Sequence, residues 1–200
     1  MVSNEQINVI KRNGRGKESL NIDKIHSMVG FATEGITGVS ASHVEMNSGL
    51  QFFDGISTDD IQQILIKSAN DLISLESPNY QYVAARLLLF SLRKNLFHRL
   101  WEHPKFIDHI KKLIDLGLYD KGILENYTEA EIDRMGMWID HERDYSFTYA
   151  GLRQVMDKYL VQDRSTGEIY ETPQFMYMMI SATLFAKYPT ESRLQYVKKY

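Results

Sequence analysis

The first 56 residues alternate between short apolar runs and helical spacing, which predicts a small unit that mixes strands and helices. Short apolar runs bounded by turn residues are typical of strands, and the pair Asn13 and Gly14 is typical of a tight hairpin turn. Asn21 is a favourable N-cap for the helix expected after it. The expected strands are 7–12, 17–20 and 50–56, and the expected helices are 22–34 and 40–47.

From residue 57 onward the apolar residues follow helical spacing. Ser57 and Asp60 have the spacing of a capping box, and an apolar face continues from there to Ile73. The helix that opens at Pro78 is apolar on nearly every side, so it should lie at the centre of a helical bundle. Further helices are expected at 106–114, after the capping-box pair Thr128 and Glu131, at 147–160, at 173–187 and from Thr190, with one hairpin at 161–171.

Composition and charge narrow the class of protein. The chain has 200 residues, 44% of them hydrophobic, and a net charge of −3, which is ordinary for a globular protein and too acidic for a general nucleic-acid binder. It has no cysteine, so disulfides, thiolate zinc sites and thiol chemistry within the chain are excluded. The first ten residues are too polar for a signal peptide, and no apolar run is long enough to span a membrane. We therefore expect a cytoplasmic protein.

Basic residues cluster around the predicted hairpin in the stretch VIKRNGRGKESLNIDKIH. A tight turn and a helix start present backbone N–H groups, and cations beside them suit a phosphate. Glu18 and Asn21 add groups that can hydrogen-bond a base or a sugar. The alternative is a solvent-exposed hairpin with scattered cations, and composition alone favours that alternative. The five cations are Lys11, Arg12, Arg15, Lys17 and Lys24.

A second group of polar residues, STDDIQQ, begins the helix after residue 57. A helix N-terminus favours an anion, and Arg93 and Lys94 near the end of the apolar helix are candidates to reach the same place. The alternative is a simple helix cap with two cations that extend into solvent. The six histidines show no spacing typical of a metal site, and His141, which stands among charged residues, is expected at the surface or in an ion pair.

The order of these pieces resembles a known family. The stretches QFFDGISTDDI and SPNYQYVAARLLLFSLRK, which follow the basic hairpin, resemble the ATP-cone at the N-terminus of the large (alpha) subunit of class I ribonucleoside-diphosphate reductase. The later stretches YTEAEIDRM, WIDHERDYSFTYAGLRQ and KYLVQDRSTGEIYETPQFMYM resemble the helical region that follows it in enterobacterial and T-even-phage-like enzymes. The resemblance covers essentially the whole chain.

The resemblance implies a mainly α fold with a small β cap (α+β). Residues 1–98 would form an ATP-cone, a four-helix bundle with a three-stranded sheet, and 99–200 an all-helical region with one β-hairpin. ATP or dATP would bind the cone as an allosteric effector, with Mg²⁺, and no intrinsic cofactor or metal is implied. Lys11, Arg12 and Lys94 would meet the phosphates, and residues 18–24 the base and ribose. The implied site residues are Lys11, Arg12, Glu18, Ser19, Leu20, Asn21, Ile22, Asp23, Lys24, Thr58 and Lys94.

Two departures from the family pattern bear on regulation. Relatives with strong dATP feedback often carry histidine where this chain has Gln62 and Ser91, and the hairpin is one residue longer at Arg15 and Gly16. We therefore expect nucleotide binding to be retained and feedback by dATP to be weaker.

The resemblance also implies what the chain works with. The family's catalytic cysteines lie in a barrel that follows this region, so the chain is expected to be the N-terminal part of a large subunit, truncated before that barrel and without catalytic residues. Expected partners are the remainder of the large subunit, the radical-generating small subunit and further copies of the large subunit, but neither nucleic acid nor membrane. The alternative is a free-standing ATP-sensing interaction module without a catalytic role. Residues 100–200 favour the reductase.

Overall fold

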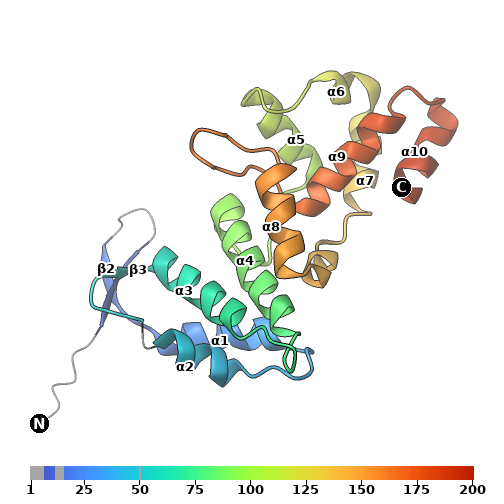
Figure 1. Cartoon of the computed structure of the whole chain (residues 1–200). Helices are drawn as coiled ribbons and strands as arrows, with labels where there is room; N and C mark the ends of the chain where they lie inside the picture. The colour runs from blue at the N-terminus through green and yellow to red at the C-terminus, as the bar shows by residue number, and fades with distance from the viewer. Residues whose placement is uncertain (1–6, 12–15, 50) are drawn as a thin grey trace, which may run out of the picture. The chain divides into compact units, whose positions relative to one another are not determined.

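The computed structural model describes residues 7–11, 16–49 and 51–200, which form two compact units (Figure 1). The first unit comprises residues up to Ser91 together with Tyr145–Leu152. The second comprises Leu92–Asp144 and Arg153–Tyr200. The long helix α4 (Tyr80–Phe97) contributes to both units. The expected division into domains after residue 98 stays a prediction.

The first unit contains a three-stranded sheet and four helices, as the sequence predicted. Strand β1 pairs with β2 in antiparallel register and with β3 in parallel register, which gives the sheet order β2-β1-β3. The strands are β1 (Asn8–Ile10), β2 (Lys17–Ser19) and β3 (Ile56–Ser57). The helices are α1 (Ile22–Thr33), α2 (Ala41–Gly49), α3 (Thr58–Asp71) and α4. The predicted turn residues Asn13 and Gly14 lie outside the described residues.

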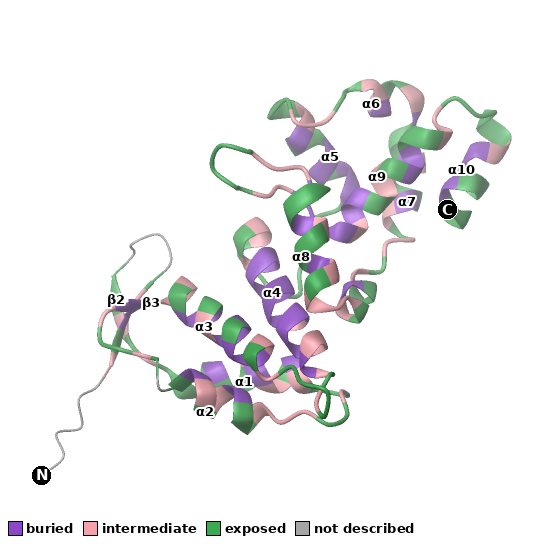
Figure 2. Cartoon of the chain, in the orientation of Figure 1, coloured by how far each residue is buried: buried purple, intermediate pink, exposed green. Residues whose placement is uncertain are grey.

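Helix α4 supplies more buried hydrophobic residues to the first unit than any other element, in agreement with its apolar sequence. Figure 2 shows buried residues on most turns of this helix, whereas the other helices of the unit expose one side. Leu87 and Leu89 are fully buried, although they point to nearly opposite sides of the helix. A helix that is apolar all round needs partners on every side, which places α4 at the centre.

The predicted third strand over 50–56 is wrong in its extent. Only Ile56 and Ser57 form β3, residues 51–55 make a turn, and Leu50 lies outside the described residues. The Asp54 carboxylate accepts from the backbone N–H of Asn8 at 2.8 Å, and Gly55 adopts a φ of +84° that favours glycine. These contacts tie the segment to the edge of the sheet as a turn. Its aromatic residues therefore do not alternate across a sheet, and the side chain of Phe53 is exposed.

The second unit is helical around one apolar core. Phe106, Ile110, Ile132 and Phe175 lie in this core, and the hairpin over 161–171 is confirmed, with the bridge between Gln162 and Ile169. The sequence did not predict α6 or the 3-10 helix. The elements are α5 (Phe106–Asp115), α6 (Gly122–Asn126), α7 (Glu129–Gly136), the 3-10 helix (His141–Ser146), α8 (Tyr149–Lys158), α9 (Pro173–Phe185) and α10 (Thr190–Lys199), and α8 begins in the first unit.

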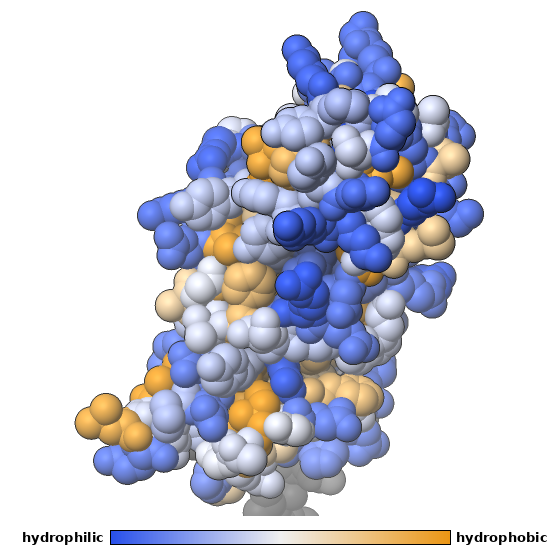
Figure 3. Space-filling model, turned by 90° about the vertical axis from the view of Figure 1, so that its right-hand side faces the viewer, coloured by the Kyte–Doolittle hydropathy of each residue, from blue (hydrophilic) through white to orange (hydrophobic). Residues whose placement is uncertain are grey.

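Figure 3 shows one face, on which apolar residues form small separate areas among polar ones. Among the described residues, no helix has both the length and the apolar character needed to cross a membrane.

Candidate functional site

The pairing of β1 with β3 brings the end of the basic hairpin strand next to a helix start. Ile10 is in register with Ser57, so Lys11, the next residue, follows β1 at the point where α3 begins. The Ser57 side chain accepts from the backbone N–H of Asp60 at 3.0 Å and caps this helix. Backbone N–H groups at a helix N-terminus attract anions. The structure therefore places Lys11 and half-buried Thr58 at one end of the sheet.

Glu18 connects the two lysines of the hairpin and of α1. Its carboxylate lies 2.9 Å from the Lys11 ammonium and 3.9 Å from the Lys24 ammonium. The hydrogen bond from Lys11 lowers the pKa of Glu18, and the charges of both lysines lower it further. These side chains are largely exposed, so the ion pairs add little stability. The ion pairs place two cations and one carboxylate at the surface, where a bound ligand can replace either partner of a pair.

The other end of the sheet leads into α1. The side chain of Asn21 accepts from the backbone N–H of Lys24 at 3.0 Å and caps this helix, as the sequence predicted. The backbone N–H of Leu20 donates to the carbonyl of Ile7 at 2.8 Å, which fixes the chain between β2 and α1. The nearby side chains of Ser19, Ile22 and Asp23 are exposed.

The predicted site residues therefore fall into three groups. Lys11, Glu18, Lys24 and Thr58 lie along one small sheet and its two helix starts, together with 19–23. Arg12, like Arg15, lies outside the described residues. Lys94 is half-buried on the part of α4 that belongs to the second unit.

Gln62 and Ser91, the positions where the chain is expected to depart from the family pattern, lie in the interior of the first unit. Gln62 is 3% exposed, and its amide donates to the backbone carbonyl of Leu87 at 2.9 Å. Ser91 is also buried and stands one helical turn after Leu87. The amide donor of Gln62 is thus engaged by α4 itself. A histidine at either position would occupy the packed contact between α3 and α4.

The expectation that Arg93 extends into solvent or toward the helix start of STDDIQQ is wrong. Its side chain is 2% exposed and donates to the backbone carbonyl of His141 at 2.6 Å. It also lies 3.5 Å from the buried carboxylate of Asp144. An arginine can be buried when its charge is paired and hydrogen-bonded, which the sequence of α4 alone does not indicate.

The expected surface position of His141 is wrong as well. Its ring stacks on the ring of His103, with centroids 3.6 Å apart and planes 7° apart. Burial, with smaller contributions from the neighbouring His103 and Arg93, lowers the pKa of His141 to about 3. Both imidazoles are therefore neutral at pH 7, because burial also lowers the pKa of His103 to about 4.

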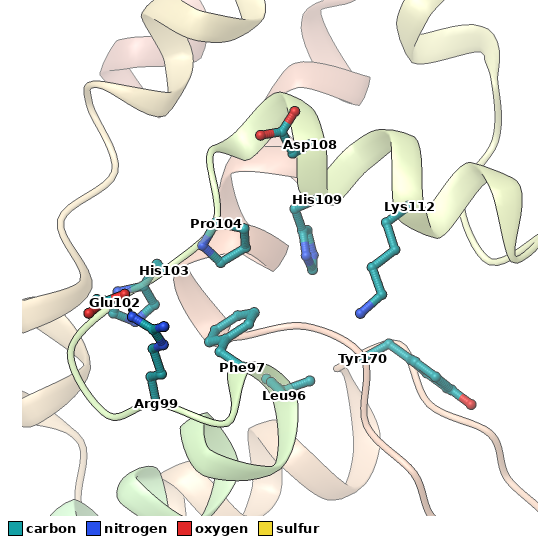
Figure 4. Close-up of a pocket in the computed structure, with 10 residues that line it drawn as sticks. All are labelled: Leu96, Phe97, Arg99, Glu102, His103, Pro104, Asp108, His109, Lys112 and Tyr170. Atoms are coloured by element: carbon teal, nitrogen blue, oxygen red, sulfur yellow. Dashed lines mark hydrogen bonds and ion pairs between the residues drawn. The ribbon is translucent and has the colours of Figure 1, made fainter.

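The second unit has a cavity of about 380 Å³ beside these histidines (Figure 4). Figure 4 shows Lys112 extending toward Tyr170, with the ring of His109 next to it. The Arg99 side chain on its rim is paired with Glu102, and burial lowers the pKa of His109 to about 4. No residue predicted for nucleotide binding lines this cavity, so it is separate from the candidate site on the sheet.

Comparisons with known proteins agree with the sequence reading. The family model of the ATP cone domain matches residues 7–95, and that of the ribonucleotide reductase all-alpha domain matches residues 145–200. The chain is 50% identical over 197 residues to the ribonucleoside-diphosphate reductase 1 subunit alpha of Escherichia coli (strain K12), with 98% of this chain and 26% of the relative covered. It is equally similar to the subunit alpha of Haemophilus influenzae, at 50% identity and the same coverage.

A phage protein is among the similar relatives. The ribonucleoside-diphosphate reductase subunit alpha of Enterobacteria phage T4 is 44% identical over 194 residues, which cover 97% of this chain and 25% of the relative. The chain thus spans about a quarter of the length of the relatives it matches. The two family models show that the chain carries the ATP cone domain and the ribonucleotide reductase all-alpha domain, in agreement with its 44–50% identity to ribonucleoside-diphosphate reductase alpha subunits.

Proposed function

We propose that this chain binds ATP and dATP as the regulatory part of a ribonucleoside-diphosphate reductase large subunit, and so controls the reduction of ribonucleotides to deoxyribonucleotides. The observation that carries the proposal is the chain of charges from Lys11 through Glu18 to Lys24, which connects two capped helix starts across one small sheet. Three residues of strand separate those starts by about 10 Å at the usual rise per residue. The charges along this site and the distance between its two helix starts fit a bound nucleotide.

We infer that each end of the sheet binds a different part of the nucleotide. Lys11 and the N-terminus of α3 at Thr58 offer cationic and backbone N–H groups, so the phosphates bind there, with Arg12 and Lys94 as further cations and Mg²⁺ on the phosphate oxygens. Glu18 and the residues up to Lys24 offer both donors and acceptors, so they bind the base and ribose. When a nucleotide binds, Lys11 pairs with its phosphates instead of with Glu18. The Glu18 carboxylate is then available to accept a hydrogen bond.

The remaining steps of the reaction belong to other parts of the enzyme. The chain has no cysteine, so the thiyl chemistry of the family takes place outside it. We propose that it acts with the catalytic remainder of the large subunit, with the small subunit and within a homo-oligomer. We further propose that it works in the cytoplasm, or in the host cytoplasm if a phage encodes it. Because we expect relatives with strong dATP feedback to carry histidine where this chain has Gln62 and Ser91, we propose that inhibition by dATP is weaker here than in those relatives.

Calorimetric titration of the 200-residue chain with ATP and with dATP tests the proposal. Both nucleotides should bind, and Lys11→Ala should weaken binding about 10- to 100-fold, the usual worth of a charged hydrogen bond. Lys67→Ala is the matched control, because Lys67 is an exposed lysine of the same unit that pairs with Asp71 at the far end of α3. Wild-type affinity in the Lys11 variant would place the site elsewhere, and no heat with either nucleotide would refute the function.

A further inference from the structure

Three residues on one side of α4 hold a short segment of the chain that is distant in sequence. Arg86, Phe90 and Arg93 are four and three residues apart, so their side chains leave the helix in nearly the same direction. Within the first unit, the Arg86 guanidinium lies 5.7 Å from the ring centre of Tyr145, and the Phe90 ring lies 6.2 Å from it. Within the second unit, Arg93 contacts His141 and Asp144. We call these three residues the α4 stripe.

The first member of the α4 stripe also holds the end of α1. Arg86 donates to the backbone carbonyl of Glu34 at 2.6 Å and to that of Ala32 at 3.4 Å. Carbonyls at a helix C-terminus have no partner within the helix and attract a cation. Helix α1 begins at Asn21, within the proposed nucleotide site, and ends at these carbonyls. The position of α1 is therefore tied to α4 through Arg86.

The last member of the α4 stripe is held in one geometry. The side chains of Arg93 and Asp144 are 2% and 0% exposed, and the amide of Gln174 donates to the second oxygen of Asp144 at 2.8 Å. A buried charge that loses its partner costs several times more than a surface ion pair. The segment that contains His141 and Asp144 must therefore follow any shift of Arg93, because the Asp144 carboxylate is shielded from the solvent that could otherwise replace the guanidinium.

We propose that Arg93 is a positioning residue that couples the nucleotide site of the ATP cone to the all-alpha region, by passing a shift of α4 to the segment His141–Tyr145. This inference rests on the proposed function, because Lys94 is one of the proposed phosphate contacts. Lys94 follows Arg93 at about 100° around the same helix, so a pull on its ammonium by a phosphate displaces Arg93 as well.

The close packing around the α4 stripe supports the transmission of a shift of α4 to the segment His141–Tyr145. A helix interior is rigid, and close-packed contacts shift between discrete arrangements instead of deforming gradually. Tyr145 directly follows Asp144 in the chain, so the two ends of the α4 stripe hold consecutive residues. A change at α1 or at Lys94 therefore reaches the same short segment.

Intrinsic fluorescence provides a selective readout of this coupling. The two tryptophans of the chain, Trp101 and Trp138, both belong to the second unit, and the ATP cone match at 7–95 contains none. We expect ATP to change the tryptophan emission of the wild-type chain, with the same midpoint as the heat of binding. Binding without any change in emission would overturn the coupling and leave the proposed function intact. Absence of binding would overturn both.

Variants of the stripe then identify the residue that carries the signal. Arg93→Lys keeps the positive charge but removes the planar guanidinium group. Asp144→Asn keeps the shape of the side chain but removes its negative charge. Each should bind ATP within about fivefold of the wild type, the lower end of typical coupling, and should lose most of the emission change. Arg153→Lys is the control, because Arg153 is an exposed arginine of the second unit paired with Asp157 at 3.0 Å. A full emission change in Arg93→Lys would refute the role of Arg93.

Hydrogen exchange on the wild-type chain tests the coupling without any variant. Peptides that contain 141–146 should exchange more slowly or faster when ATP is added, whereas peptides from α10 should not change. Equal exchange in both peptides with and without ATP would overturn the proposal, even if Arg93→Lys and Asp144→Asn did not fold.

Discussion

At the scale of single residues, one ion pair in the second unit has the geometry that makes such pairs strong. The Arg193 guanidinium meets both oxygens of Glu131 at 2.8 Å and lies 4.4 Å from the ring centre of Tyr127. Its side chain is 10% exposed. Lysine cannot reproduce the planar fork or the stacking, so Arg193→Lys should lower the free energy of unfolding by about 1–2 kcal/mol in urea denaturation. Lys121→Ala, which removes an exposed pair with Glu125, should change it little. Equal stability of Arg193→Lys and wild type would contradict this reading.

Residue-level prediction from sequence succeeds where the partner is nearby in the chain. The spacing of Thr128 and Glu131 predicted a capping box, and both of its hydrogen bonds are present. The sequence did not show that Arg193, 62 residues away, would bind the same carboxylate. It was wrong for Arg93 and His141 for the same reason. A charged residue is usually exposed, and the partner that permits burial is supplied by tertiary structure.

At the scale of elements, two helices begin at threonine and differ in how the hydroxyl is used. Thr128 caps α7 by accepting from the backbone N–H of Glu131 at 3.3 Å, whereas Thr172, at the start of α9, has a buried hydroxyl without a hydrogen-bond partner among the described residues. Thr128→Ala should therefore cost about 1 kcal/mol of unfolding free energy. Thr172→Val, which removes the unpaired hydroxyl and keeps the shape, should be neutral or stabilising. Thermal denaturation of both variants measures the contrast, and a larger loss in Thr172→Val would refute it.

Helices and strands were predicted correctly where the sequence pattern that determines them lies within the element itself. Helices α1 and α5 were expected from apolar spacing and from the glycines that follow them, and Gly35 and Gly117 adopt φ values of +70° and +71°. The strand over 50–56 was overextended because its apolar residues suggested a strand, while the turn depends on Asn8 from a distant segment. The short helix α6 has only five residues, too few for a periodic pattern.

At the scale of the whole molecule, the candidate site could be predicted because its residues are nearly contiguous. Its described residues, Lys11 and 16–24, lie at the end of β1, in β2 and at the start of α1, so local chemistry and the family resemblance both indicated them. The parallel pairing of β1 with β3, which brings Thr58 to Lys11, depends on 46 intervening residues and has no local signal. The α4 stripe was not predicted at all, since its partners at 141–145 come from another part of the chain.

The buried histidines make the stability of the chain depend on pH in a defined direction. Burial lowers the pKa of His103 and of His109 to about 4 and that of His141 to about 3, each below the ordinary value of 6.5. Below pH 6.5 the unfolded chain therefore binds protons that the folded chain does not, and stability falls as pH falls toward 4. Asp144 acts oppositely, because burial raises its pKa to about 6 and the folded chain takes up that proton first.

The net effect should be a loss of about 1–2 kcal/mol of unfolding free energy per pH unit between pH 6 and pH 4.5, since three histidines outweigh the two carboxyl groups of Asp144 and Glu171, whose pKa burial raises. Urea denaturation at several pH values measures this slope. His141→Phe keeps an aromatic ring against His103 and removes one titrating group, so its slope should be shallower by up to about 1.4 kcal/mol per pH unit. His26→Gln is the control, because the His26 side chain is 68% exposed. If the wild type were equally stable at pH 7 and pH 5, the histidines would have to be solvated in the folded chain, and the stacked pair would not form in solution.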